Sequence, residues 1–389
     1  MENLWKQLID LLKRAPSTVH TTPSSDEQEH DCREQILTAL TECRKDINEE
    51  DLPDFITFAK EFFTNNPKQD YYRLLDISQS DEDNRIVVIG DTHCDYNSLA
   101  TIFSKLSLSK DYDYLNNARF IFLGDYLDRG AILFEYLKLL FTLKTILGDR
   151  CILLKGNHEL VGSVEGMLIS RVIPANSCPL LNEYCKDTEF LDSFADYFSY
   201  LPSYLLLKTR KNNILLVHGG LPREEYFDQC LVSDETGELI CDDIIRNRIL
   251  SNMIWSDPRH MNVIQTTDTR FEFGPSHFDK FSEINNIDMI LRSHEPVTNG
   301  VESFYDGRLY TIFSTGGNTN PDTGYSYVTN PSFAIINSDG EPRFESIYYR
   351  LILAPTLFYY DNPVTIQPPF DDLHLNDEFI KMNGNNAES

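Results

Sequence analysis

The segment Gly124-Asp125-Tyr126-Leu127-Asp128-Arg129-Gly130 gives the clearest indication of how this chain folds. It follows the apolar run Phe120-Ile121-Phe122-Leu123, which is typical of a buried strand. The glycine at the end of the run permits a tight turn, and carboxylate and guanidinium groups come directly after it. The sequence therefore predicts a strand whose carboxyl end carries polar side chains.

Four more apolar runs end in the same way, in side chains that ligate metals. Carboxylates, imidazoles and carboxamides are hard or borderline ligands for divalent ions. Five strand ends that offer such ligands in one chain predict a hydrolytic centre with two metal ions. The runs and the segments that follow them are residues 85–89 with Gly90-Asp91-Thr92-His93, residues 151–154 with Gly156-Asn157-His158-Glu159, residues 213–217 with His218-Gly219-Gly220, and residues 287–291 with Arg292-Ser293-His294.

Strand and helix patterns alternate through the first three of these segments. This βαβαβ order predicts a parallel core, and we expect an α/β fold in which two packed mixed β-sheets form a β-sandwich flanked by helices. We expect residues 161–200 to be mostly helical and strands to dominate from residue 205 onward. The clearest predicted elements are strands at 85–89, 119–123, 151–154, 213–217, 287–291, 308–314 and 332–337, and helices near 96–107 and 131–147.

The pattern divides the chain into three predicted parts. Residues 1–80 form a helical N-terminal extension with a linker near 15–31, residues 81–350 a catalytic domain, and residues 351–389 a C-terminal tail. Residues 2–14 show the spacing of an amphipathic helix, which either packs on the same protein or docks to a partner. We expect residues 32–76 to be helical as well.

Charge and cysteine content exclude several classes of protein. The chain has 34 Lys and Arg against 61 Asp and Glu, and its net charge of −27 makes it a poor binder of nucleic acid or anionic membrane. No apolar stretch is long enough for a membrane span, and charges interrupt the apolar N-terminus, so we expect no signal peptide. The eight cysteines form no CxxC pair. We expect reduced thiols in a cytoplasmic protein, with a Cys178–Cys185 disulfide as the alternative.

The ordered motifs resemble those of the phosphoprotein phosphatase (PPP) family, the Ser/Thr phosphatases within the calcineurin-like metallophosphoesterases. That family carries GDxHG, GDxVDRG, GNHE, HGG and a late histidine after Arg-x. The resemblance runs from about Glu49 to about Ser338. Broader metallophosphoesterases usually lack four further segments present here, which favours the narrower family. These segments are Leu201-Pro202, Trp255-Ser256-Asp257-Pro258, Phe271-Glu272-Phe273-Gly274 and Phe313-Ser314.

The resemblance implies a metallophosphoesterase fold and a set of metal ligands. Two cations about 3.5–4 Å apart need a shared anionic ligand to offset their repulsion. The mixed nitrogen and oxygen set fits Mn²⁺, Fe or Zn²⁺ better than Ca²⁺ or all-oxygen Mg²⁺, and we expect two divalent ions, Mn²⁺ foremost. By motif, Asp91 and His93 bind the first metal, Asn157, His218 and His294 bind the second, and Asp125 bridges the two.

The resemblance also implies how the reaction runs. A water activated by both metals attacks phosphorus in a single in-line displacement. Arg129 and Asn157 bind the phosphoryl oxygens, His158 protonates the leaving alkoxide, and Asp128 orients His158. Arg270 is a candidate for a second phosphate-binding arginine. The plain structural alternatives are that Asp128 and Arg129 pair with each other and that His158 caps a helix.

Two segments depart from the family pattern. Cys94-Asp95 stands where the family has Gly-Gln, which indicates either a tolerated small residue or a redox-sensitive thiol. Thr315-Gly316-Gly317-Asn318 stands where the family has Ala-Pro-Asn-Tyr. The loop tyrosine that touches substrates is therefore absent at that position, which leaves substrate preference open.

The function that the sequence favours is hydrolysis of phosphoserine or phosphothreonine on a phosphorylated protein. Phosphotyrosine is an alternative substrate in the same centre, because the altered loop removes a familiar constraint. A small-molecule phosphatase of the dinucleoside polyphosphate type is a second alternative. A third is an inactive scaffold that binds partners through its N-terminal helices, although every expected ligand is present.

Overall fold

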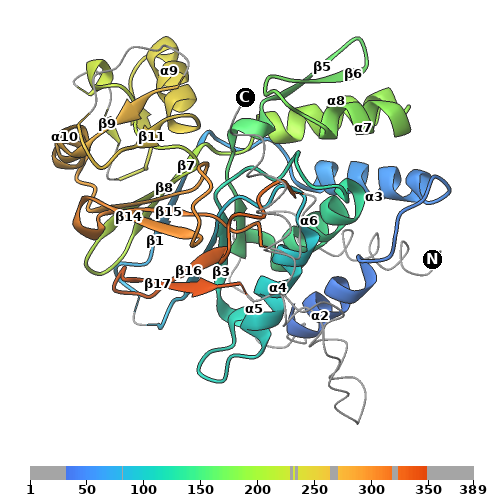
Figure 1. Cartoon of the computed structure of the whole chain (residues 1–389), viewed down its shortest axis with the longest axis horizontal. Coiled ribbons are helices and arrows are strands. Elements are labelled where there is room, and N and C mark those ends of the chain that lie inside the picture. The colour runs from blue at the N-terminus through green and yellow to red at the C-terminus, as the bar shows by residue number, and fades with distance from the viewer. Residues whose placement is uncertain are drawn as a thin grey trace, which may run out of the picture. The chain divides into compact units, whose positions relative to one another are not determined.

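The computed structural model describes residues 32–80, 82–227, 231–232, 235–262, 270–317 and 323–347. Contacts divide the chain into two units, residues 1–352 and 353–389, and every described residue belongs to the first. The predicted helix at 2–14, the linker near 15–31 and the tail at 351–389 lie outside the described residues. Figure 1 labels most of the helices and strands described below.

The first large sheet holds the three strands that precede the first metal motifs. Its order is β17-β16-β2-β3-β4, and β2, β3 and β4 run parallel. Helices α4 and α6 connect these three strands, which confirms the predicted βαβαβ core. The elements are β2 (Ile86–Ile89), α4 (Tyr96–Ser107), β3 (Arg119–Phe122), α6 (Leu133–Leu147), β4 (Cys151–Leu153), β16 (Ser332–Ile336) and β17 (Pro342–Ser346).

The second large sheet supplies the two later motifs. Its order is β1-β7-β8-β13-β15-β14, in which β8, β13 and β15 run parallel to one another. The strands are β1 (Tyr72–Asp76), β7 (Tyr204–Lys208), β8 (Asn213–Val217), β13 (Met289–Arg292), β14 (Val301–Phe304) and β15 (Leu309–Ile312).

The two sheets pack face to face with helices on their outer sides. Buried apolar side chains from both sheets, such as Val88, Ile121, Leu216 and Leu291, form one cluster between them. A second cluster joins the outer face of the first sheet to α3 (Leu52–Asn65), α4 and α6, and a third joins the second sheet to α9 (Asp243–Met253) and α10 (Pro275–Asn285). Figure 1 shows α9 and α10 on the side of β9 and β11, away from α3, α4 and α6. The predicted β-sandwich flanked by helices is confirmed.

The prediction of helix through residue 76 is wrong at its end. Only α2 (Cys32–Glu42) and α3 are helical in this stretch, and residues 72–76 form strand β1. This strand pairs in parallel with β7, and Tyr72 lies opposite Tyr204. Aromatic residues favour a half-buried strand surface, so pairing with β7 decides the structure here.

The prediction of helix across residues 161–200 is also wrong in part. Residues 161–170 form a hairpin of β5 (Val161–Val164) and β6 (Met167–Ser170). Its two-residue turn has positive φ at Glu165 (53°) and Gly166 (75°), as a type I′ turn requires. Helices α7 (Ser177–Tyr184) and α8 (Thr188–Ser199) follow as expected.

Shorter elements complete the described part of the chain. Helices α9 and α10 were not predicted in the strand-rich second half. No helix in the described ranges combines the length and apolar character that crossing a membrane requires. The cysteines among the described residues are free, Cys178 and Cys185 included. The remaining α-helix and strands of the described ranges are α5 (Tyr114–Asn117), β9 (Leu231–Val232), β10 (Leu239–Ile240), β11 (Asp257–Pro258) and β12 (Glu272–Phe273).

Candidate active site

Five strand ends from the two sheets bring their polar side chains together. The strands are β2, β3 and β4 of one sheet and β8 and β13 of the other. Parallel strands present their carboxyl ends at one edge, which is why motifs far apart in the sequence meet here. The side chains that follow these strands are Asp91, His93, Asp125, Asn157, His218 and His294, and each is at most 5% exposed.

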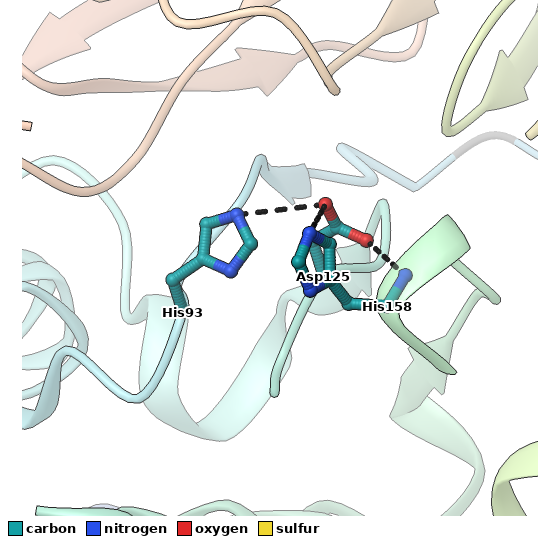
Figure 2. Close-up of side chains that lie close together, drawn as sticks. All are labelled: His93, Asp125 and His158. Carbon is teal, nitrogen blue, oxygen red and sulfur yellow. Dashed lines mark hydrogen bonds and ion pairs between the residues drawn. The ribbon is translucent and has the colours of Figure 1, made fainter. Parts of the chain in front are cut away.

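The first cluster forms around His93 and two carboxylates. The Nδ1 atom of His93 lies 2.8 Å from the carbonyl oxygen of Leu127, which can only accept, so this nitrogen donates its hydrogen. Nε2 therefore presents its lone pair to Asp91 Oδ2 at 3.6 Å and Asp125 Oδ2 at 3.5 Å. Figure 2 shows the His93 and His158 rings turned toward the Asp125 carboxylate.

The second cluster forms around His218. Its Nδ1 lies 3.0 Å from the Leu123 carbonyl oxygen, so Nε2 faces the site as an acceptor. This Nε2 lies 2.9 Å from Asn157 Oδ1, 3.1 Å from His294 Nδ1 and 3.3 Å from Asp125 Oδ1. Asp125 thus offers one carboxylate oxygen to each cluster.

The chemistry of these donors fits divalent cations. In the second cluster the Asn157 side-chain oxygen faces only hydrogen-bond acceptors, and a cation among them would stabilise this orientation. Without a cation, rotating the amide by 180° would let its nitrogen donate hydrogen bonds to the same atoms. In the first cluster Asp91 Oδ2 is buried and has no hydrogen-bond partner among the described residues. Converging buried lone pairs are stabilised by a positive charge placed between them. The residues therefore fit two cations that share Asp125.

The two buried carboxylates behave differently without a cation. Burial, together with the nearby Asp125 carboxylate, raises the pKa of Asp91 to about 6. Burial also opposes ionisation of Asp125, but the charges of His218 and His158 outweigh it and hold the pKa of Asp125 well below its usual range. Asp125 is thus the permanent anion of the pair, as a ligand shared by two cations must be.

His158 is held by Asp128 and faces Asp125. Asp128 Oδ2 lies 2.7 Å from His158 Nδ1, while His158 Nε2 lies 4.0 Å from Asp125 Oδ2. Burial lowers the pKa of His158, but the Asp125 carboxylate and the hydrogen bond with Asp128 outweigh it and raise that pKa. His158 lies inside the short 3₁₀ turn 157–159, whose N-cap is Gly156, so it is not a helix cap.

The amino end of α7 fixes Asp128. Its second oxygen, Oδ1, accepts hydrogen bonds from the backbone N–H groups of Asn176 at 2.9 Å and Ser177 at 2.8 Å. The segment that follows the β5–β6 hairpin therefore reaches back to orient the His158 partner. No ion pair joins Asp128 to Arg129 within the described residues, which removes the alternative that the two pair with each other.

Arg129 has a free donor beside the centre. Its backbone has φ of 70°, in the left-handed region, and its N–H donates to Asn176 Oδ1 at 2.9 Å. The side-chain Nε is buried and finds no hydrogen-bond partner in the described part of the chain. A half-buried arginine with an unused, buried Nε donor is suited to bind an oxyanion.

Glu159 joins two motif loops and is not turned toward either cluster. Its carboxylate accepts from the backbone N–H groups of Asp125 and Tyr126 at 2.8 Å and of Gly156 at 2.9 Å. These contacts give Glu159 a structural role between the two loops. The same contacts bring Gly156 so close to Asp125 that a Cβ at position 156 would collide with it.

Several polar residues of the site have strained backbones. His93, Asp125, Asp128 and His294 have φ of 42°, 56°, 67° and 72°, which residues with a Cβ seldom adopt. Such conformations persist where surrounding hydrogen bonds enforce them, and they concentrate at functional sites.

Arg270 lies near the second cluster but is engaged by carboxylates. Its Nε donates to Asp257 Oδ2, and its NH2 lies 3.7 Å from Glu295 Oε1. Asp257 Oδ1 in turn lies 3.9 Å from His294 Nε2. The side chain of Arg270 is 46% exposed.

The segment Cys94-Asp95 serves the structure of the first motif. The Cys94 thiol is buried and donates to the Tyr126 carbonyl oxygen at 3.3 Å. Asp95 caps α4 by accepting from the Ser98 N–H at 2.9 Å. Burial raises the pKa of Cys94, so the thiol is unreactive in this state.

Two residues of the site were not found from the sequence. Ser293 accepts from the Asp91 N–H at 2.8 Å and its hydroxyl contacts Asp91 Oδ1, so it joins the ends of β2 and β13. Its place between Arg292 and His294 was the available signal. Tyr325 lies against His93 from the connection between β15 and β16, and no motif in the sequence indicated it.

Comparisons with known proteins agree with this geometry. The sequence profile of the calcineurin-like phosphoesterase family matches residues 84–298, more than half of the chain. The chain is 29% identical over 277 residues to the serine/threonine-protein phosphatase 4 catalytic subunit of Saccharomyces cerevisiae, which covers 70% of this chain and 80% of that protein. It is 30% identical over 246 residues to human serine/threonine-protein phosphatase 5, where the match covers 60% of this chain and 43% of the relative.

Other relatives are matched over part of their length. The chain is 31% identical over 240 residues to the serine/threonine-protein phosphatase PP2A-like PPG1 of Candida albicans, across 59% of this chain and 51% of that protein. It therefore spans about half the length of this relative. A solved structure of a Saccharomyces cerevisiae protein serine/threonine phosphatase with similarity to human phosphatase PP5 has the same fold, with a TM-score of 0.57, 21% identity and coverage of 84% and 93%. The chain belongs to the calcineurin-like phosphoesterase family and, within it, to the phosphoprotein phosphatases, which are metal-dependent hydrolases of phosphoric monoesters.

Proposed function

We propose that this protein removes phosphate from phosphoserine or phosphothreonine on protein substrates. The observation that carries the proposal is the buried Asp125, which offers one oxygen to each of two clusters of metal-ligand atoms. The relatives that the chain matches are named serine/threonine-protein phosphatases, which supports this substrate class.

Each cation has a proposed set of ligands from this chain. Asp91 and His93 hold the first, His218, His294 and Asn157 hold the second, and Asp125 is shared. When bound, the cations supply Lewis acidity that polarises the phosphoryl group and lowers the pKa of water. The mixed nitrogen and oxygen ligand set supports Mn²⁺, Fe or Zn²⁺ as the native ions, with Mn²⁺ the ion we propose first.

Arg129 and Asn157 are the proposed phosphate-binding groups. The unused Nε of Arg129 supports this role, because a guanidinium binds two oxyanion oxygens with its planar fork. Arg270 is proposed as a second guanidinium for phosphate. It would have to exchange part of its contact with Asp257 for the substrate.

His158 is the proposed acid for the leaving group. The hydrogen bond to Asp128 keeps a proton on Nδ1 of His158. Nε2 carries a second proton only when the ring is cationic, and this is the proton that would be transferred to the leaving group. The raised pKa of His158, caused by Asp125 and Asp128 against the effect of burial, supports a protonated ring near neutral pH. A strongly basic serine or threonine alkoxide needs this proton to leave.

The wider setting of the protein is proposed as well. The proposed parts are residues 1–80, whose helices dock a partner, a catalytic domain at residues 81–350 and a tail at residues 351–389. Within the first part, α3 and β1 also belong to the fold of the catalytic domain, because α3 packs on the first sheet and β1 pairs with β7. The free thiols among the described residues support a reducing, cytoplasmic location.

A substrate panel tests the proposed function. Purified protein supplied with Mn²⁺ is assayed on matched phosphoserine, phosphothreonine and phosphotyrosine peptides beside dinucleoside polyphosphates. We expect the highest kcat/KM on the phosphoserine or phosphothreonine peptides. A preference for phosphotyrosine or for the nucleotides would contradict the proposed substrate class, and absence of turnover in fully metal-loaded protein would indicate a scaffold.

A further inference from the structure

Tyr325 brings a phenol ring to the His93 side of the centre. Its ring lies against the imidazole, with centroids 5.4 Å apart and planes at 30°. Its Oη lies 3.5 Å from His93 Nε2, the nitrogen that also faces the Asp91 and Asp125 carboxylates. A hydroxyl group thus lies at the edge of the first cluster.

The surrounding loop holds this ring in place. The ring packs edge-on against the buried Phe313, with centroids 5.0 Å apart. The Val328 N–H donates to the Tyr325 carbonyl oxygen at 2.9 Å. Gly316 lies against Tyr325 and Val328 of the same loop. Its φ is 131°, and a Cβ at this position would lie 2.8 Å from the Tyr325 carbonyl oxygen. These contacts fix the backbone and the ring of Tyr325, so the ring has one orientation relative to His93.

The position of the hydroxyl makes it a donor without a strong acceptor. A distance of 3.5 Å to His93 Nε2 is longer than the usual range for a hydroxyl hydrogen bond. A neutral phenol carries its proton at ordinary pH. Burial and the Asp91 carboxylate raise the pKa of Tyr325 and the charge of Arg129 opposes this rise, so Arg129 lies within electrostatic range of the hydroxyl.

We propose that Tyr325 is a phosphate-binding residue whose hydroxyl donates to an oxygen of the phosphoryl group that Arg129 holds. The proposal rests on the proposed function, because it assumes that this region receives a phosphoryl group. It also accounts for the departure at Thr315-Gly316-Gly317-Asn318, because a phenol from later in the same loop lies beside the centre. Donors on two sides of one phosphoryl group would fix its orientation relative to the cations.

Tyr325→Phe tests the proposal, and Tyr327→Phe is its matched control. Phenylalanine at 325 keeps the ring that packs on His93 and Phe313 and removes only Oη. Tyr327 lies in the same loop, with its ring centroid 6.2 Å from that of Tyr325, and is 52% exposed. The readouts are the Kd of inorganic phosphate by calorimetry on Mn²⁺-loaded protein, the bound metal by mass spectrometry, and the thermal unfolding midpoint.

We expect Tyr325→Phe to weaken phosphate binding by about 10-fold to 100-fold, the size expected for a hydrogen bond to a charged group. Metal content and unfolding midpoint stay at the wild-type level, and Tyr327→Phe binds phosphate as the wild type does. Wild-type phosphate affinity in Tyr325→Phe would show that the ring only packs, and loss of metal would show that Oη is a ligand. Either result overturns the proposal.

The test is separate from that of the proposed function. Phosphate binding is measured without turnover, so a protein that binds phosphate through Tyr325 and hydrolyses none of the phosphopeptides contradicts only the proposed function. A protein that hydrolyses phosphopeptides and whose Tyr325→Phe variant binds phosphate normally contradicts only the role of Tyr325. Metal-loaded wild-type protein that does not bind phosphate contradicts the role of Tyr325 directly.

Discussion

At the residue scale, His158 has a different neighbour at each ring nitrogen. Asp128 holds Nδ1 at 2.7 Å, and Nε2 faces Asp125 Oδ2 at 4.0 Å. If Nε2 gives its proton to the leaving alkoxide, His158→Ala slows phosphoserine turnover by about 10²–10⁴-fold. The loss on an activated aryl phosphate is smaller, because its leaving group is a weak base. Steady-state rates on both substrates measure the difference.

His260→Ala is a control for this experiment, because His260 is exposed, pairs with Glu302 and stacks on Phe304. Metal content stays near normal in both variants. Equal losses on the two substrates with metals intact would mean that His158 binds phosphate or positions the nucleophile. Loss of metal would make His158 a ligand, which the position of Nε2 beside Asp125 also permits.

Asp128 controls the pH range in which His158 is an acid. Burial lowers the pKa of His158, and Asp125 and Asp128 raise it above its ordinary value. Activity on alkyl phosphates therefore falls as pH rises through this raised pKa. Asp128→Asn removes one of the raising contributions, so the falling limb of the pH–kcat/KM profile moves to lower pH. If the falling limb stays at its wild-type pH in Asp128→Asn, Asp128 does not raise the pKa of the group that titrates there.

Arg270 gives a third prediction at this scale. Losing a charge-assisted contact to the phosphoryl group lowers kcat/KM in Arg270→Ala, by an amount that corresponds to about 1.5–3 kcal/mol. Arg259→Ala is the control, because Arg259 also pairs with Glu295 and has no proposed contact with substrate. If kcat/KM stays at the wild-type value in Arg270→Ala, the arginine serves only its ion pairs with Asp257 and Glu295.

At the scale of elements, Glu159 connects the loops after β3 and β4. Its two oxygens accept from backbone N–H groups of both loops. Glu159→Gln turns one acceptor into a donor that faces N–H groups, at a cost of about 1–3 kcal/mol. We expect a lower unfolding midpoint and lower metal content, measured by calorimetry and metal analysis. Glu165→Gln, on the exposed hairpin turn, is the control and should change neither the unfolding midpoint nor the metal content. If Glu159→Gln also leaves both at the wild-type level, the two loops do not depend on Glu159.

Prediction from the sequence worked where local pattern and packing agree. Helix α4 and strand β8 have the predicted bounds, because their apolar spacing is also the spacing of their buried faces. Strand β1 was missed because its structure depends on pairing with β7, which is distant in sequence. The β5–β6 hairpin was missed, because residues 161–200 were expected to be mostly helical, although Glu165-Gly166 suits a two-residue turn.

The site was predictable for the same reason that the parallel core was. Strand ends meet at one edge, so motifs that follow strands identified the side chains that the structure brings together. Tyr325 directly follows no predicted strand. It contacts His93 because the loop around it is folded so that Gly316 lies against Tyr325 and Val328. Such a contact depends on tertiary packing, which neither spacing nor periodicity describes.

At the scale of the whole molecule, the ligand atoms come from both sheets of the sandwich. Asp91 and Asp125 follow β2 and β3, whereas His218 and His294 follow β8 and β13. Cations that bind only the folded chain therefore join the two sheets and stabilise it by mass action, by about 2.7 kcal/mol at a free ion concentration of 100 Kd. We expect the unfolding midpoint to rise with added Mn²⁺ and to fall under chelation. A midpoint that does not respond to Mn²⁺ would mean that the clusters bind no ion with useful affinity.

The central claim is that one buried carboxylate serves two cations, and metal analysis of Asp125→Asn tests it most directly. Wild-type protein, Asp125→Asn and the control Asp128→Asn are loaded with Mn²⁺, dialysed and analysed for bound metal per chain. We expect about two ions in the wild type and in Asp128→Asn, and a loss from both sites together in Asp125→Asn. Wild-type metal content in Asp125→Asn would contradict the shared ligand and, with it, the two-cation centre as described.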